Sequence, residues 1–210
     1  MTPFAIGLGS NLGDSLAIVR GAVRALDQAG QRGGSRVRAM SRVYRSPPVG
    51  GVEQPAFLNA VAILEWGDAP ESLLATLHSV ERSHGRDRAS ESIRWGPRVL
   101  DLDILLAGED GSISCVAQHL TIPHPRAFDR AFVLKPLADV APTWRHPATG
   151  ERVDLALSRV ADDARLVVPI AEGLAAPCRG TMVCAGDSAR DVDGRDGRDG
   201  PSAGGGSPGA

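Results

Sequence analysis

The sequence predicts an α+β fold, in which a mostly antiparallel sheet is packed by helices. Segments with the alternation of strands and segments with the periodicity of amphipathic helices follow one another along the chain. Joins that contain glycine and proline separate them. With 210 residues, of which 42% are hydrophobic, the chain can bury one domain core of ordinary size.

The first half of the chain supplies three predicted strands and two predicted helices. The strands cover residues 3–8, 37–44 and 57–66, and the first ends in a glycine-rich turn. A helix begins near Asp14, with apolar residues spaced by three and four, and Asn11 or Asp14 can cap it. Residues 69–84 have the pattern of a second amphipathic helix.

The second half begins with an arginine-rich loop that leads into an aspartate-bearing strand near residues 100–106. Short helices are predicted around residues 130–138 and 155–160. This order of elements predicts a ferredoxin-like sandwich. Parallel pairing between some strands is the alternative.

Composition predicts two regions and excludes several classes of protein. Residues 1–170 form one predicted folded domain, and residues 171–210, rich in Gly and Asp, a disordered tail. No segment approaches a membrane span, and the three cysteines form no CxxC pair, which predicts a cytoplasmic protein without a disulfide framework. A net charge of −2 and 4% aromatic residues argue against nucleic acid as a partner. No obligate protein partner is expected.

Asp101 and Asp103 alternate with leucine and isoleucine, so a strand places both carboxylates on one face, about 7 Å apart. Two like charges this close are costly unless something neutralises them, and Mg²⁺ brought with a phosphate substrate is the usual partner. Relief of the repulsion predicts that Asp101→Asn raises thermal stability. A half-exposed edge strand whose aspartates face water is the alternative.

Arginine is the predicted phosphate ligand, because the chain has no P-loop: its single lysine, Lys135, precedes Pro136 and follows no glycine loop. Guanidinium groups grip phosphate oxygens in a bidentate fashion. The candidates lie near or after the aspartate pair, together with His124: Arg86, Arg88, Arg94, Arg98, Arg126 and Arg130.

A flat, nitrogen-containing ligand is predicted by a second group of residues. Pro47 and Val49 form a rigid apolar edge, and Phe57 and Phe132 are two of the few aromatic residues. Asn59 shares a strand face with Phe57, and its amide can both donate to and accept from a heterocycle. Each of these residues could equally belong to the core.

These motifs, in this order, resemble the 6-hydroxymethyl-7,8-dihydropterin pyrophosphokinase family of folate biosynthesis. The resemblance covers roughly residues 4–145, and the segment from Arg94 to Asp103 is its most specific part. It implies an ATP-dependent diphosphotransferase, a kinase that transfers the pyrophosphoryl group of MgATP to the hydroxymethyl oxygen of 6-hydroxymethyl-7,8-dihydropterin. It also implies mobile loops over the site.

The resemblance assigns roles by position. Asp101 and Asp103 would hold two Mg²⁺ ions, and Arg86 and Arg98 would neutralise the phosphates in the transition state. The implied ATP ligands are Glu81, Arg88, Arg94, Arg98, Thr121, His124 and Arg130. The implied pterin ligands are Ser46, Pro47, Val49, Phe57, Asn59, Trp95 and Phe132, with the ring stacked between the two phenylalanines.

The chain departs from familiar members of that family at several positions. Phe57 and Pro125 stand where some members carry Tyr, and His78 where some carry Gln. The loop from Gly85 to Arg94, which carries Arg86 and Arg88, is about two residues longer. Two alternatives stay open: a binding module without catalysis, and a nucleotidyl or simple phosphoryl transferase. Whether Asp103 or a phosphate oxygen accepts the hydroxyl proton is also open.

Overall fold

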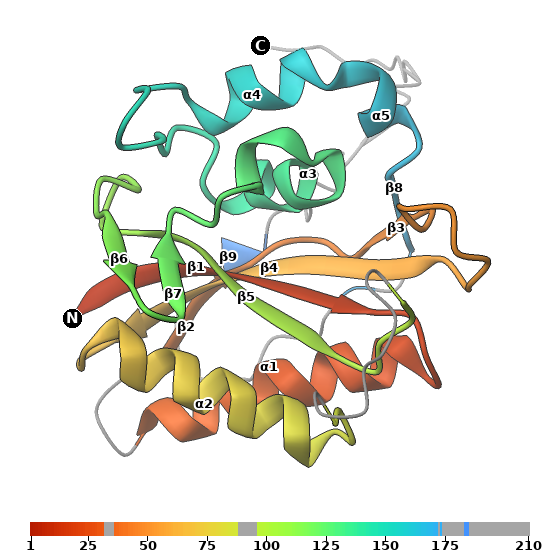
Figure 1. Cartoon of the computed structure of the whole chain (residues 1–210), viewed down its shortest axis with the longest axis horizontal. Helices are drawn as coiled ribbons and strands as arrows, with labels where there is room; N and C mark the ends of the chain where they lie inside the picture. The colour runs from red at the N-terminus through yellow and green to blue at the C-terminus, as the bar shows by residue number, and fades with distance from the viewer. Residues whose placement is uncertain (32–35, 88–95, 172, 174–182, 185–210) are drawn as a thin grey trace, which may run out of the picture.

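A central sheet separates two layers of helices in the computed structural model, which describes residues 1–31, 36–87, 96–171, 173 and 183–184 (Figure 1). The long strands are β1 (Thr2–Ser10), β2 (Arg36–Met40), β4 (Phe57–Trp66) and β5 (Asp101–Ala107), adjacent in the order β5-β1-β4-β2. Each pair among these four is antiparallel. The predicted α+β architecture is confirmed, and this strand order is that of a ferredoxin-like unit.

Short strands extend this sheet. β3 (Tyr44–Ser46) pairs with the beginning of β4, β8 (Val168–Pro169) with β3, and β9 (Val183–Cys184) runs parallel to β2. The prediction of one strand over residues 37–44 was wrong. β2 ends at Met40 because the Ser41 hydroxyl accepts the backbone N–H of Val61 and so interrupts the ladder.

Helices cover the two sheet faces unequally. α1 (Ser15–Gln31) and α2 (Pro70–Ser83) lie along one face, and Asp14 caps α1 by accepting the N–H of Ala17. The other face carries the 3₁₀ turn η1 (Ala127–Asp129) and three shorter helices: α3 (Ala131–Val140), α4 (Val153–Arg159) and α5 (Ala161–Arg165). A hairpin that the sequence did not predict, β6 (Cys115–Ala117) and β7 (Leu120–Ile122), follows β5.

The strands alternate between two hydrophobic cores. Phe4, Ile6 and Leu8 of β1 face α1 and α2, whereas Ala5 faces α3 and α4. The predicted alternation of β5 fails at Leu106, which lies in the second core. The reason is a register shift between Ala5 and Ile6, which inserts an extra residue into β5.

The sheet face that carries α3 lacks large apolar side chains toward one end. There Gly7 and Gly9 of β1 pair with Asp103 and Asp101 of β5, and Gly9 also pairs with Asn59 of β4. Both glycines lie inside β1, whereas the sequence predicted that they belong to the glycine-rich turn in which a strand over residues 3–8 ends. Residues this small or polar form no core, so this end of the face is open to a ligand.

A partly buried polar network connects α3 to β3 and to the residues before it. Asp139 accepts hydrogen bonds from the Tyr44 hydroxyl at 2.9 Å and from two nitrogens of the Arg42 guanidinium at 2.8 and 3.1 Å. Burial, helped by Asp139, raises the pKa of Tyr44, so its hydroxyl stays protonated and donates.

Among the described residues no helix has the length and apolarity to cross a membrane.

Loss of this network should lower stability in steps. Tyr44→Phe removes one donor and should reduce the free energy of unfolding by about 1 kcal/mol. Asp139→Ala leaves the Tyr44 hydroxyl unpaired where it is 1% exposed, and should cost about 2–3 kcal/mol. Denaturant unfolding measures both, with the exposed Arg36→Gln as a control expected to change stability by less than about 1 kcal/mol. Equal stability of Asp139→Ala and the unmodified chain would contradict the assignment.

Candidate active site

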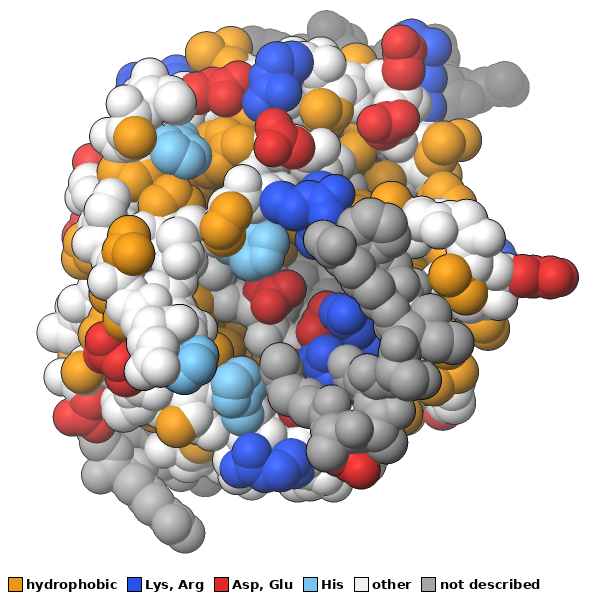
Figure 2. Space-filling view, in the orientation of Figure 1, with side chains coloured by type: hydrophobic (Ala, Val, Ile, Leu, Met, Phe, Trp, Pro, Cys, Tyr) orange, Lys and Arg blue, Asp and Glu red, His pale blue; other side chains and the backbone are white. Residues whose placement is uncertain are grey.

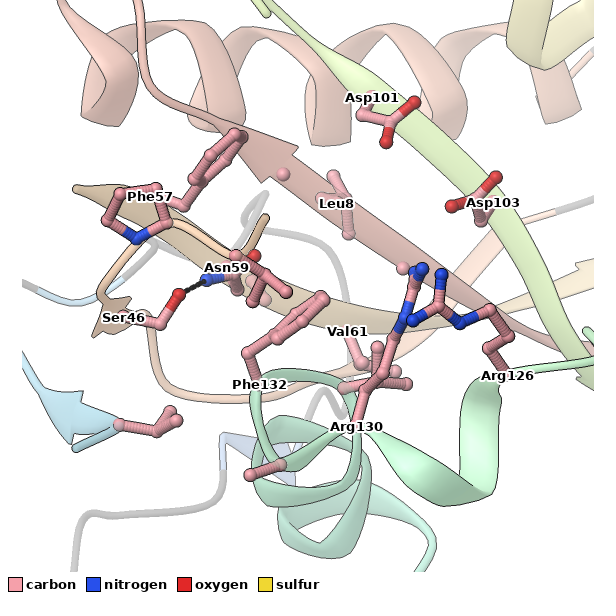
Figure 3. Close-up of a pocket in the computed structure, with 18 of the residues that line it drawn as sticks. Leu8, Ser46, Phe57, Asn59, Val61, Asp101, Asp103, Arg126, Arg130 and Phe132 are labelled. Atoms are coloured by element: carbon pink, nitrogen blue, oxygen red, sulfur yellow. Dashed lines mark hydrogen bonds between the residues drawn. The ribbon is translucent and has the colours of Figure 1, made fainter. Parts of the chain in front are cut away.

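A pocket of about 730 Å³ occupies the open end of the α3 face. Figure 2 shows acidic and basic side chains side by side in a hollow of the molecule, and Figure 3 shows the lining residues of the pocket. Strands β1, β3, β4 and β5 form its floor, and the residues from His124 to Val133 form one side. Its lining is polar at β5 and aromatic where Phe57 of β4 and Phe132 of α3 enter it.

Asp101 and Asp103 project from the same face of β5 into this pocket, as the alternation predicted (Figure 3). Within the described ranges no third His, Cys, Asp or Glu joins them to make a three-ligand metal cluster. This donor set suits Mg²⁺, which uses one or two carboxylates and completes its octahedron with water and substrate phosphate. The two residues therefore fit a cation that arrives with a phosphorylated substrate.

The pKa values of the two carboxylates are shifted in opposite directions. Burial disfavours the ionised form of Asp101, but Arg98 and Arg86 outweigh burial and hold its pKa below the usual range. Arg98 Nη1 donates to Asp101 Oδ2 at 2.6 Å, and Arg86 donates to Oδ1. For Asp103, burial, Asp101 and Glu81 raise the pKa to about 6. The sequence-based expectation of mutual repulsion therefore applies to Asp103, whereas Asp101 is stabilised by cations.

Arg86 forms an ion pair with Glu81, which lies near the end of α2. Its Nη1 donates to Glu81 Oε1 at 2.6 Å and to the carbonyl of Leu100 at 3.1 Å. The same Glu81 oxygen accepts the backbone N–H of Leu102 at 2.8 Å. Because the side chains of Arg86 and Glu81 are 4% and 1% exposed, this charge pair is a fixed part of the pocket wall.

Asn11 fixes the backbone of Arg98. Its Oδ1 accepts the Arg98 N–H at 2.7 Å, and its own N–H donates to the Arg98 carbonyl at 3.0 Å. The Asn11 amide also donates to the side chain of Gln54 and to the carbonyl of Pro55. One side chain thus joins the segment after β1, the loop before β4 and the segment that leads into β5.

Cationic side chains line the opposite rim. Burial and the neighbouring Arg130 lower the pKa of His124, so the imidazole is neutral at physiological pH. Its Nδ1 accepts the backbone N–H of Arg126, which leaves the proton on Nε2. The Arg130 guanidinium lies 5.5 Å from the ring centre of Phe132. This rim faces Asp101 and Asp103 across the pocket (Figure 3).

Phe57 and Phe132 approach the other part of the pocket from β4 and α3 (Figure 3). Between them Asn59 donates from Nδ2 to the Ser46 hydroxyl at 2.9 Å, and both side chains are buried. This bond fixes the orientation of the amide. Its carbonyl oxygen is thereby aimed as an acceptor for a ligand that enters between the rings.

Comparison with known proteins decides the family. The sequence model of the 7,8-dihydro-6-hydroxymethylpterin-pyrophosphokinase family matches residues 5–142. The chain belongs to this family. It is 44% identical over 142 residues to the 2-amino-4-hydroxy-6-hydroxymethyldihydropteridine pyrophosphokinase of Methylorubrum extorquens, an alignment that covers 68% of this chain and 84% of that protein. The enzyme of the same name from Pseudomonas aeruginosa is 42% identical, covering 68% and 82%.

The fold agrees with this membership. A crystal structure of HPPK-DHPS from Plasmodium falciparum, with pterin and p-hydroxybenzoate, superposes with a TM-score of 0.58 at 13% identity. The match covers 77% of this chain but only 44% of that longer chain. The family confirms the predicted pyrophosphokinase of folate biosynthesis, an enzyme of the diphosphotransferase class.

The pocket brings together most of the residues that the family resemblance named. The lining includes Ser46, Pro47, Val49, Phe57, Asn59, Arg86, Arg98, Asp101, Asp103, His124, Arg130 and Phe132. Arg88, Arg94 and Trp95 lie outside the described residues. Glu81 and Thr121, both implied as ATP ligands, do not line the pocket. Glu81 is buried behind Arg86, and Thr121 is exposed on the β6–β7 hairpin.

Other lining residues escaped the family-based assignment. Arg126 was a phosphate candidate by its position alone, and it does line the pocket. Asp163, Leu166 and Val167 come from α5 and the residues after it, where the sequence carries no motif. Asn11 was considered only as a helix cap, and no local pattern signals its contacts with Arg98.

Stability should depend on pH through Asp103. Its folded pKa of about 6 lies above the ordinary 3.8, so the folded chain gains stability on protonation and loses it as pH rises through this window. Asp103→Asn should therefore be more stable than the unmodified chain above pH 7, by about 1–3 kcal/mol, and equally stable below about pH 4. Denaturant unfolding without added cation measures the difference. The exposed Asp68→Asn serves as the control, and a difference independent of pH would refute the assignment.

Proposed function

We propose that the chain transfers the β,γ-pyrophosphoryl group of MgATP to the hydroxymethyl oxygen of 6-hydroxymethyl-7,8-dihydropterin, giving AMP and the pterin diphosphate. One observation carries the proposal: a single pocket joins an aromatic and amide subsite to a carboxylate and guanidinium subsite. An acceptor between the rings would present its hydroxymethyl group toward the site of phosphate transfer.

The acceptor end suits a pterin. Phe57 and Phe132 offer their faces to a flat ring, and a stacked aromatic arrangement gains energy beyond simple burial. The Asn59 carbonyl, oriented by its bond to Ser46, would accept from the ring's N–H groups. Pro47 and Val49 would close the apolar edge.

The phosphate end suits a metal nucleotide. We propose that Asp101 and Asp103 hold two Mg²⁺ ions, which would supply charge neutralisation for the phosphates. Arg98 is 27% exposed in the pocket, so it can turn from Asp101 to a phosphate oxygen, while Arg86 supplies a fixed positive charge. His124 and Arg130 would bind other phosphate oxygens, with Arg126 beside them.

Several finer assignments are part of the same proposal. Arg88, Arg94, Thr121 and Trp95 keep the roles that the resemblance implies, whereas Glu81 is proposed to act through Arg86. Residues 1–170 are proposed as the catalytic domain of a cytoplasmic enzyme. ATP and the pterin are the proposed partners.

Product analysis tests the reaction. Incubation with MgATP and 6-hydroxymethyl-7,8-dihydropterin should give AMP and the pterin diphosphate in equal amounts. Asp101→Asn and Asp103→Asn should each lower kcat by at least about 100-fold, because the loss falls on transition-state charge. Asp68→Asn should match the unmodified chain. Formation of ADP would indicate simple phosphoryl transfer, and pterin binding without any product would indicate a binding module.

Variants of Arg98 should lower kcat without a matching change in the Kd for the pterin. Arg98→Ala should lower kcat by about 100-fold or more, since a donor to developing phosphate charge is lost. Arg98→Lys should recover little, because an ammonium group cannot make bidentate contacts. The Kd for the pterin should change less than about twofold, since Arg98 lies at the phosphate end. Single-turnover kinetics measures the chemical step, with Arg38→Ala, on the exposed side of β2, as the control.

A further inference from the structure

One side of the pocket comes from chain that lies beyond the family match. The family model ends at residue 142, yet Asp163, Leu166 and Val167 line the same pocket as Phe132 and Ser46. These residues belong to α5 and to the link between α5 and β8. They therefore lie outside the segment that the family model matches.

The sheet and α3 hold this segment in place. β8 pairs antiparallel with β3, with Val168 opposite Arg45, next to the pocket residue Ser46. The N–H of Ile170 donates to the carbonyl of Val43 at 2.9 Å. Val167 is 3% exposed and packs in a small core, against which the ring of Phe132 also packs. The position of Phe132 thus depends on this segment.

Lys135, the single lysine of the chain, connects α3 to this segment by hydrogen bonds. Its Nζ donates to the carbonyls of Ala164 and Val167 at 2.8 and 2.7 Å. These oxygens lie at the carboxyl end of α5, where a cation is favoured. Lys135 follows Phe132 by three residues in α3, so both side chains lie on the same side of that helix.

Leu166 stands at the mouth of the pocket. It lines the cavity and is 61% exposed, so much of its apolar surface is in contact with water. A flat heterocycle bound against Phe132 would cover part of this side chain and remove it from water. The apolar area so buried would contribute to binding of the acceptor.

We infer that residues 161–169 form a wall of the pterin pocket, in which Leu166 contacts the bound pterin and Lys135 is a positioning residue that sets the wall against Phe132. This inference rests on the proposed function. It predicts that the wall affects affinity for the pterin and leaves affinity for the nucleotide unchanged.

Two matched leucines test the contact. Leu166→Ala should weaken binding of 6-hydroxymethyl-7,8-dihydropterin by about three- to tenfold, measured by calorimetry on the full chain with Mg²⁺ and a nonhydrolysable ATP analogue. Leu155→Ala, on α4 and 59% exposed but outside the pocket, should change the Kd less than twofold. The Kd of the ATP analogue should stay within twofold in both. Equal pterin affinities of the two variants would overturn the inference.

Lys135 variants test the positioning role. Lys135→Met should raise the pterin KM by about three- to tenfold with little change in kcat or in the KM for ATP. Lys135→Arg should restore most of the affinity, because guanidinium can donate to both carbonyls. Parallel loss of pterin and ATP affinity in Lys135→Met would show a merely structural role and refute the inference. Absence of pterin binding by the unmodified chain would refute the proposed function. Equal pterin binding by the unmodified chain and the variants would refute only this inference.

Discussion

The buried guanidinium of Arg86 is the interaction on which the site depends. It joins Glu81 of α2, the carbonyl of Leu100 and the carboxylate of Asp101. A buried charge is tolerated when it is paired and hydrogen-bonded, and here Nη1 donates to Glu81 in α2, to Asp101 in β5 and to the Leu100 carbonyl just before β5. Arg86 therefore ties α2 to β5 and, together with Arg98, keeps Asp101 ionised.

This arrangement explains why neighbouring aspartates differ. Two guanidinium groups lower the pKa of Asp101. The pKa of Asp103, two residues further along β5, is raised by burial and by the neighbouring carboxylates. A cation bound between them would remove the difference, since it supplies to Asp103 the positive charge that Asp101 already has. The polar end of the sheet face therefore fits the proposed cation, which would relieve the cost of the buried charge on Asp103.

Much of the fold follows from local sequence patterns. The strand at residues 57–66 and the helices α1 and α2 are predictable because long apolar periodicities determine them. The break at Ser41 and the bulge near Leu105 are not, because they depend on hydrogen bonds and register with partner strands. Likewise, motif residues such as Asp103 and Asn59 are found from sequence, whereas Leu166 reaches the pocket only through tertiary packing.

The glycines within β1 have a consequence for how this enzyme can evolve. Glycine weakens a strand interior, yet Gly7 and Gly9 occupy a strand that is hydrogen-bonded on both sides, to β4 and β5, where the neighbouring strands compensate. A Cβ at Gly9 would meet only ordinary contacts, at 3.6 Å from Asn59 and 3.8 Å from Asp101. Larger residues there would strengthen β1 while occupying the space between the two subsites. Selection for greater stability would therefore act against activity at this position.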